Sequence, residues 1–345
     1  MIKKLRSWVG GYRSTVWCLG GCEKHSEKPL KIIYMGSEKN KNYLKHIMFG
    51  GQAEESCHGK RWVWDFPKIQ NKLQGMDMKI LEEKSPGRTH SQEAGSLYAP
   101  CWVVGHVDVA DLTNLIKGSS SIKEDMRKIR KYGLSFEISN DKDRYDEFFN
   151  DMYMPYISKA HGNRTVPISY DVMMKRMGIS ELLLIKREGE FIGGEILVYD
   201  GPHVRAWSLG VKNGDYSYVK MGVIGAMYYF RNGYLKEKGY RVVNVGASRA
   251  FLNDGVLQYK KKWGVTLDSA KGGMHMHVIQ KSTGVESFFR HNPFITVVGG
   301  ELVGVVFADE RDASDLAYRE KLRKKYYIGG MGGLDIRSID EWFRD

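Results

Sequence analysis

The stretch that decides the fold is residues 239–264, GYRVVNVGASRAFLNDGVLQYKKKWG. Gly239 ends a helical pattern that covers 219–238, an apolar strand follows over 241–245, and a polar turn leads into a lysine-rich helix. With the strand that precedes residue 219, this order is strand, helix, strand. Such a connection joins parallel strands of one sheet. We therefore expect a parallel crossover at this point of the chain.

The residues before this stretch predict the rest of the same sheet. Three β-rich runs separated by Glu188-Gly189 and Gly201-Pro202 turns are typical of an antiparallel meander. A basic helix ended by Gly133, a short strand and two more helices precede the meander. The expected elements are helix 122–132, strand 134–138, helices 142–159 and 169–177, and strands 181–187, 190–199 and 204–211.

The two ends of the chain are patterned differently. Residues 1–27 mix Gly, Ser and charge without a sustained period, which predicts an irregular lead-in. The region after the lead-in predicts strands 31–35, 61–66, 78–81 and 96–109 and helix 38–49. The region after the meander and its crossover predicts helix 252–263, strands 274–279, 295–298 and 302–307, and a charged helix over 309–325.

The length favours two domains, because 345 residues exceed what a single hydrophobic core usually supports. Hydrophobic residues make up 42% of the chain and aromatic residues 12%. This is enough apolar material to form buried cores, and it argues against extensive disorder. Residues 114–121, with Gly118 and three consecutive serines, supply a linker and a helix cap. We therefore expect one domain at 28–117 and a second at 118–345.

Composition also bears on location and partners. The sequence has neither an apolar run near the roughly 18 residues that span a bilayer nor a signal peptide, which predicts a cytoplasmic protein. The four cysteines are too few for a disulfide framework, and Cys18, Cys22 and His25 lack a fourth ligand nearby, so we expect free thiols and no metal. The net charge of +12 is typical of a protein with an anionic partner, although a generally basic proteome gives the same excess.

Several short motifs within the opening stretch resemble one family. Residues 244–248, NVGAS, end the strand, Asn253-Asp254-Gly255 forms the turn, and residues 257–264, LQYKKKWG, supply an aromatic-Lys-x-x-aromatic-Gly segment. With the basic helix 123–131, these motifs resemble the Fem-like acyltransferases over roughly residues 120–270. The resemblance implies a mixed α+β fold with tandem GNAT-like domains, of which the first is shortened or degenerate and the second is a complete mixed sheet flanked by helices.

The resemblance further implies an N-acyltransferase that moves an acyl or aminoacyl group to an amine. The second domain would hold the donor, which is an acyl-CoA, an acyl-carrier or an aminoacyl-tRNA and acts as a co-substrate that is not bound permanently. Residues 218–226, YVKMGVIGA, lack the Q/R-x-x-G-x-G/A spacing of acetyl-CoA-dependent members, which argues against acetyl-CoA itself. The alternative is a non-catalytic protein that binds an anionic ligand on the same scaffold.

Three residues are candidates for catalysis. Lys260 stands where the peptidoglycan aminoacyltransferases place a lysine near the phosphorylated substrate or the reacting carbonyl, and the resemblance implies that role; a solvated helix face is the alternative. Glu195 lies in mid-strand, where a half-buried carboxylate has a raised pKa and accepts an amine proton, unless it lies on the wet face. Asp254 fits either catalysis or a cap of the following helix.

Four residues are candidates for binding the donor. Lys220 and Gly222 lie near a helix start, where unpaired N–H groups and the helix dipole favour phosphate; an ordinary helix start with packing glycines is the alternative. Ser248 and Arg249 lie at the carboxyl end of a strand, where open sheets commonly bind ligands. The guanidinium of Arg249 can form paired hydrogen bonds with phosphate or carboxylate.

Four more residues are candidates for contacts with the acceptor. Arg127 and Arg130 fit a phosphate or the acceptor end of a tRNA, or else an exposed charged face. Asn253 lies in the turn after the parallel strand, beside the donor candidates. Tyr259 lies four residues from Trp263, a spacing more typical of core packing than of stacking on a substrate.

Overall fold

The computed structural model describes residues 13–66, 68–69, 73–83, 95–162 and 167–344. The chain divides into two compact units, each assembled from segments that are distant in the sequence. Unit 1 consists of Met1–Val103, Ser248–Leu257 and Ser269–Asp345, and unit 2 consists of Val104–Ala247 and Gln258–Asp268.

Unit 1 is organised around a sheet of order β3-β1-β2-β4-β13-β5. Helix α2 (Glu38–Phe49) packs on it, and its ends follow the usual capping chemistry: the Ser37 side chain accepts a hydrogen bond from the Asn40 N–H, and Gly50 closes the helix with φ 62°. The strands are β1 (Arg13–Cys22), β2 (Pro29–Gly36), β3 (Glu54–Trp62), β4 (Met78–Glu83), β5 (Ser96–Ala99) and β13 (Gly273–Val278).

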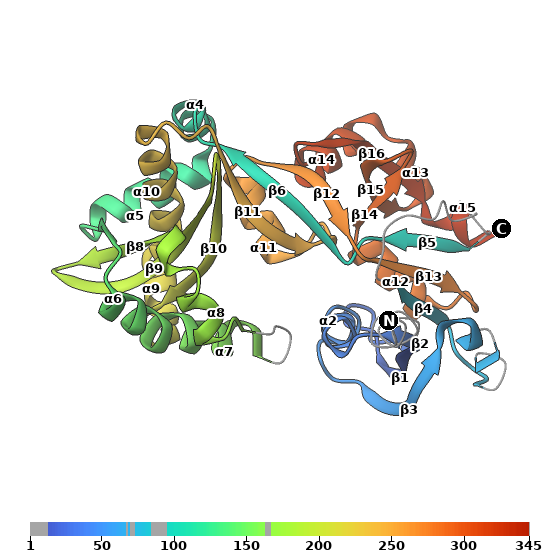
Figure 1. Cartoon of the computed structure of the whole chain (residues 1–345). Coiled ribbons are helices and arrows are strands. Elements are labelled where there is room, and N and C mark those ends of the chain that lie inside the picture. Colours follow the sequence, from blue (N-terminus) through green and yellow to red (C-terminus); the bar gives the residue numbers. More distant parts are fainter. Residues whose placement is uncertain (1–12, 67, 70–72, 84–94, 163–166, 345) are drawn as a thin grey trace. The chain divides into compact units, whose positions relative to one another are not determined.

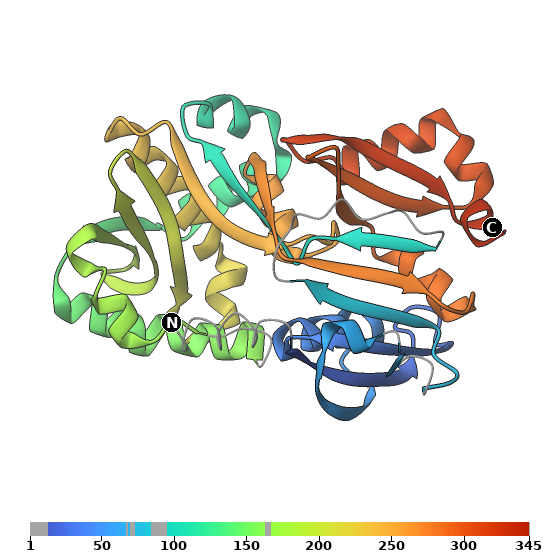
Figure 2. The same ribbon diagram turned by 45° about the vertical axis from the view of Figure 1, so that its right-hand side comes forward.

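Strand β13 returns the C-terminal part of the chain to this sheet. It pairs antiparallel with β4 on one side and with β5 on the other, so orange and blue-green strands lie side by side in Figure 2. Met274 and Met276 from β13 are buried in the same core as Leu44 of α2. The predicted boundary, which assigned everything after residue 117 to the second domain, therefore differs from the observed division.

A smaller sheet of order β14-β15-β16 completes unit 1. Phe288, Phe289, Phe294 and Phe307 lie in one hydrophobic core with aromatic ring centroids 5.1–6.4 Å apart. Its strands are β14 (Phe294–Val298), β15 (Glu301–Ala308) and β16 (Met331–Ser338), and its helices are α12 (Thr283–His291), α13 (Glu310–Ser314), α14 (Leu316–Tyr326) and α15 (Ile339–Arg344).

Unit 2 is built on a sheet of order β12-β6-β11-β10-β9-β8-β7. The strands are β6 (Trp102–Asp108), β7 (Ser135–Ser139), β8 (Ser180–Arg187), β9 (Glu190–Asp200), β10 (His203–Val211), β11 (Val242–Arg249) and β12 (Val265–Lys271). The helices are α4 (Leu112–Gly118), α5 (Ser120–Lys131), α6 (Lys142–Glu147), η2 (Phe148–Tyr153), α7 (Met154–His161), α8 (Tyr170–Met174), α9 (Tyr216–Met221), α10 (Val223–Glu237) and α11 (Gly255–Lys262). The mixed α+β class that the sequence predicts is confirmed.

Helices cover both faces of the central strands of this sheet (Figure 1). Two adjacent glycines in β9 allow the close approach. A Cβ at Gly193 would lie 2.8 Å from Met227 of α10, and a Cβ at Gly194 would lie 3.3 Å from Phe148 of η2. Strand β9 is therefore buried from Phe191 to Val198, and the side chains of this segment lie in the protein interior.

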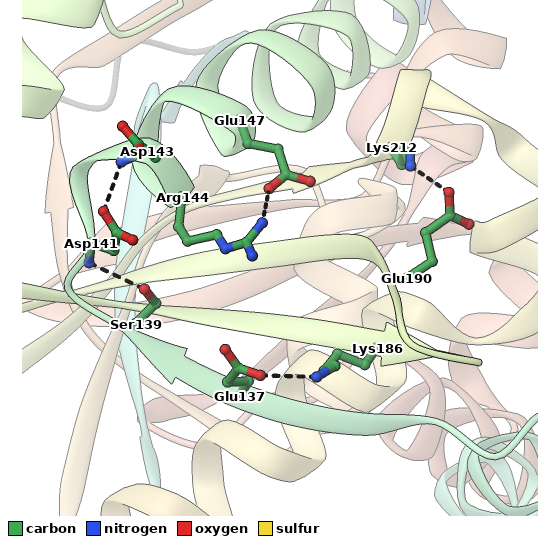
Figure 3. A network of polar contacts seen from close by, with 9 residues as sticks. All are labelled: Glu137, Ser139, Asp141, Asp143, Arg144, Glu147, Lys186, Glu190 and Lys212. Carbon is green, nitrogen blue, oxygen red and sulfur yellow. Dashed lines mark hydrogen bonds and ion pairs between the residues drawn. The ribbon is translucent and has the colours of Figure 1, made fainter.

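Several ion pairs lie at the exposed end of the sheet (Figure 3). Lys186 of β8 pairs with Glu137 of β7 at 2.9 Å, and Lys212 pairs with Glu190 of β9 at 2.5 Å. Asp141 caps α6 by accepting a hydrogen bond from the N–H of residue 143. Exposed pairs of this kind each contribute at most about 1 kcal/mol, so the two aromatic and aliphatic cores carry the stability of unit 2.

Several predicted elements differ from the observed ones. The irregular lead-in is wrong over 13–22, because β1 pairs with β2 and β3; residues 1–12 lie outside the described residues. The predicted strand 61–66 is wrong, because the observed strand β3 covers Glu54–Trp62. This strand lies at the edge of its sheet, and its polar sequence has no apolar period. The predicted helix 219–238 is two helices separated at Gly222, and the helix 309–325 is two helices separated at Asp315.

Candidate functional site

The central feature of unit 2 is a parallel strand pair that ends early. Strands β10 and β11 pair only at Val204 with Val243 and at Arg205 with Asn244. Strand β10 continues to Val211 and stays paired with β9 except at Trp207, and β11 continues to Arg249. Beyond the second pair, the facing backbone edges of these two strands are not joined by the ladder. The predicted parallel crossover is confirmed, and the ladder stops at the point where the strands would otherwise hold the sheet closed.

A β-bulge lies directly after this point. The register of β10 against β9 shifts between Ala206 and Ser208, so Trp207 has no opposite residue. Bulges leave a residue unpaired and re-aim neighbouring side chains, and they are over-represented beside active sites. The hydroxyl of Ser208 is buried and has no hydrogen-bond partner among the described residues. This segment of β10 thus offers polar groups that the protein itself does not use.

Lys260 lies beside the part of β11 that follows its last pair with β10. Its ammonium donates to the carbonyl oxygens of Gly246 at 3.1 Å and Ala247 at 3.0 Å, and its side chain is 6% exposed. These carbonyls lie in β11 beyond the last pair with β10, so the lysine supplies donors for oxygens that this ladder leaves unbonded. The alternative of a solvated helix face is therefore excluded for Lys260.

Glu195 is fully inside the protein. It points from β9 to α10, where Nη1 of Arg231 donates to its two oxygens at 3.1 and 3.2 Å; Glu195 is 3% exposed and Arg231 is 0% exposed. Burial raises the pKa of the Glu195 carboxyl, and the charges of Arg231 and Lys260 offset part of that rise. The predicted half-buried carboxylate is wrong, because Gly193 lets α10 approach and cover this position.

Arg231 is itself held by neighbouring groups. Its Nε donates to Oδ1 of Asn232 at 3.0 Å, and its guanidinium carbon lies 4.2 Å from the ring centroid of Tyr228. The sequence analysis did not single out Arg231. A cation in the middle of the apolar helix pattern 223–237 is the signal that would have identified it, because an isolated buried charge requires a partner.

The helix start that the sequence predicts as a phosphate cradle is already occupied by a cap. The N-terminus of α9 is already capped by Asp215, whose carboxylate accepts a hydrogen bond from the Ser217 N–H at 2.8 Å, and Lys220 lies over the ring of Tyr216. Gly222 separates α9 from α10 with φ 103°, and no side chain caps α10. The helix start with uncapped N–H groups is therefore that of α10, behind Gly222.

The remaining predicted residues of unit 2 have local partners. Arg127 forms a two-point pair with Glu124 and is 58% exposed, and Arg130 is exposed on the same helix. Tyr259 packs against Tyr228 with ring centroids 5.3 Å apart and belongs to the core that surrounds Trp263. The core interpretation of Tyr259 is therefore confirmed. On the same helix, Lys262 forms an ion pair with Asp125 of α5 at 2.5 Å.

Four predicted residues belong to unit 1. Asp254 caps α11 by accepting hydrogen bonds from the N–H groups of residues 256 and 257, both at 3.1 Å, and Asn253 donates to the carbonyl of residue 291. The Ser248 hydroxyl is buried, with no hydrogen-bond partner in the part of the chain that the structure describes. Arg249 is buried between Trp102 and Tyr43. The predicted site residues are thus divided between the two units.

Other classes of site receive no support from the described residues. Among them, no group of three or more His, Cys, Asp or Glu side chains could hold a metal ion, and all four cysteines are free. None of the described helices is long and apolar enough to cross a bilayer.

No model of a known protein family matches this sequence. No curated protein matches it either.

Solved structures do resemble the chain. L-PGS from Bacillus licheniformis is 11% identical, with 74% of this chain and 79% of that one covered and a TM-score of 0.40. FemX is 15% identical, with 73% and 82% covered and a TM-score of 0.40. A GCN5-related N-acetyltransferase-like protein from Streptococcus suis is 12% identical, with 76% and 83% covered and a TM-score of 0.31. All three are below 25% identity and have TM-scores below 0.5, so the function must be argued from this chain's own side chains.

Proposed function

We propose that the protein is an N-acyltransferase whose unit 2 holds an activated acyl or aminoacyl donor along β10, where the ladder with β11 ends. The observation that carries this proposal is the coincidence of three features on one strand: pairing with β11 that stops after Arg205, the bulge at Trp207, and the unpartnered hydroxyl of Ser208. A donor with amide or ester groups in an extended arm can form hydrogen bonds with the backbone groups of β10 that do not pair with β11.

The reaction forms one bond and breaks one. The amine nitrogen attacks the donor carbonyl carbon, the new C–N bond forms, and the C–S or C–O bond to the carrier breaks. The nitrogen gives up a proton and the departing sulfur or oxygen takes one. Donors aimed at the carbonyl oxygen stabilise the charge that develops on it, and the unpaired backbone beside Trp207 with the Ser208 hydroxyl is suited to that role.

Lys260 and Glu195 have different roles in this proposal. Lys260 holds the part of β11 that follows its last pair with β10, through the carbonyls of Gly246 and Ala247, which makes it a positioning residue. Glu195 is the proposed proton acceptor only if the amine reaches it in spite of its burial and its pair with Arg231. The start of α10 behind Gly222 is the proposed place for a phosphate of the donor.

The donor class is tested with the purified full chain. Acyl-CoA esters of different lengths and aminoacyl-tRNA are offered with a mixture of primary amines, and release of the free thiol or of deacylated tRNA is measured. We expect turnover with one donor class, and a loss of about 100- to 1,000-fold in kcat with Ser208→Ala, the range seen when one donor to the oxyanion is removed. If neither class is turned over or raises the melting temperature, the proposal is wrong.

A non-catalytic binding protein is the second candidate. The burial of Glu195 favours this candidate. The sequence predicts Glu195 as the base, but its carboxylate already accepts hydrogen bonds from Arg231. The two candidates separate when Ser208→Ala and Lys260→Ala are compared with wild type: in a binding protein, ligand affinity changes and there is no turnover to lose.

A further inference from the structure

Unit 1 contains two cations that share one aromatic ring. The guanidinium carbon of Arg249 lies 3.8 Å from the ring centroid of Trp102, and Nζ of Lys39 lies 4.7 Å from the same centroid. Tyr43 covers Arg249 at 4.2 Å, so the guanidinium lies close to two aromatic rings. Lys39 and Arg249 are 210 residues apart in sequence, yet the fold of unit 1 brings them to one place.

Neither of these charges has an ion-pair partner among the described residues. Over the residues that the structure describes, no salt bridge involves Lys39 or Arg249, whereas Lys41 and Lys45 of the same helix both pair with Glu55. The carboxylate of Asp254 favours the charged Arg249 electrostatically, but its hydrogen bonds cap α11. Burial lowers the pKa of Lys39, and the charge of Arg249 lowers it further, so the two cations repel each other.

The neutral groups around Arg249 fix its orientation. Nη1 of Arg249 donates to Oδ1 of Asn40, and Nδ2 of Asn40 donates to Sγ of Cys101 at 3.3 Å. Burial raises the pKa of the Cys101 thiol to about 12, so the sulfur is uncharged at neutral pH and does not act as the counter-ion. The guanidinium is therefore held in one place by Asn40 and two rings, and its remaining N–H groups supply paired donors.

We propose that Arg249 and Lys39 bind an oxyanion, the phosphate or carboxylate group of a ligand. A buried cation without a partner is costly, and an anion that accepts hydrogen bonds from it recovers that cost. The planar donor fork of Arg249 gives the direction of the paired hydrogen bonds, and Lys39 adds a second charge. This inference does not depend on the proposed transferase function.

Anion binding is tested by calorimetry on the full chain, without donor and at fixed ionic strength in chloride. The probes are inorganic pyrophosphate, inorganic phosphate and succinate. We expect saturable binding of at least one probe, weakened tenfold or more by Arg249→Gln and three- to tenfold by Lys39→Gln. Preference for pyrophosphate or phosphate assigns a phosphorylated ligand, and preference for succinate assigns a carboxylate.

Lys45→Gln is the matched control, because Lys45 lies on the same helix and pairs with Glu55. Its affinity should stay within twofold of wild type. Arg249→Lys keeps the charge but not the fork, so we expect affinity between wild type and Arg249→Gln, and this variant decides the matter if Arg249→Gln does not fold. Absence of saturable binding, or an equal loss in Lys45→Gln, overturns the inference. Loss of this binding site with turnover intact would leave the proposed function standing, and binding without turnover would leave only the inference.

Discussion

Arg231 in unit 2 and Arg249 in unit 1 are both buried arginines that lie over aromatic rings, at 4.2 Å from Tyr228 and 3.8 Å from Trp102. They differ in one respect. Arg231 donates to the two oxygens of Glu195, whereas Arg249 takes part in no salt bridge within the described part of the chain and donates instead to the neutral amide of Asn40. Arg231 thus has its counter-ion within the fold, whereas Arg249 is available to an anion that comes from solution.

The largest expected effect is on stability, and it differs between the two arginines. Arg231→Met should lower the free energy of unfolding by about 3–5 kcal/mol, because it leaves the buried carboxylate of Glu195 without its partner. Arg249→Met should change it by only about 1 kcal/mol, because the loss of stacking is offset by the removal of an unneutralised buried charge. Urea unfolding followed by circular dichroism measures both. Equal losses in the two variants would show that the two cations are not in different electrostatic states.

How much of this comparison the sequence predicts depends on the element. Helix 38–49 and the three-strand meander are predicted closely, because their apolar periods and turn residues are local signals. Strand β13 is predicted as a strand but assigned to the wrong unit, since its pairing with β4 and β5 spans about 200 residues and leaves no local signal. Strands β12 and β16 and helix α12 are not predicted.

The candidate site is predicted in part for the same reason. Arg249 and Lys260 follow from their motif, and Asp254 was given as a cap alternative that the structure confirms. Lys39 and Arg231 are not predicted, because what distinguishes them is their partners. Lys39 matters only because Trp102 and Arg249 reach it from distant segments, and Arg231 only because β9 carries Glu195 opposite α10.

The second effect tests whether the Glu195–Arg231 pair is structural or catalytic. Replacing both residues, Glu195→Leu with Arg231→Met, should recover most of the roughly 3–5 kcal/mol lost in the single variant, because apolar residues of similar size fill the same space without unpaired charge. Activity then gives the second readout. If turnover returns with stability, Glu195 is not the proton acceptor; if the double variant is stable and at least 100-fold slower, Glu195 is the base.

The third effect is stabilisation by a bound anion, which should depend on Arg249 and not on Arg231. An anion at 100 times its Kd stabilises the fold by about 2.7 kcal/mol. We expect pyrophosphate to raise the melting temperature of wild type and of the Glu195→Leu, Arg231→Met double variant equally, and to raise that of Arg249→Gln by less. A shift in Arg249→Gln as large as in wild type would place the anion somewhere other than beside Trp102.

The smallest effect concerns Lys39→Gln, which should weaken anion binding but raise the free energy of unfolding. Burial lowers the pKa of Lys39, so the folded chain holds this proton less tightly than the unfolded chain. The resulting penalty is present at pH 7 and fades as the pH rises from the folded pKa toward the unfolded value near 10.4. Lys39→Gln should therefore be more stable than wild type at pH 7 by up to about 0.5 kcal/mol, with a smaller difference at pH 10. Urea unfolding at both pH values measures this, and a Lys39→Gln variant that is less stable at pH 7 would mean that Lys39 is already neutralised in the free protein, which would remove the contrast with Arg231.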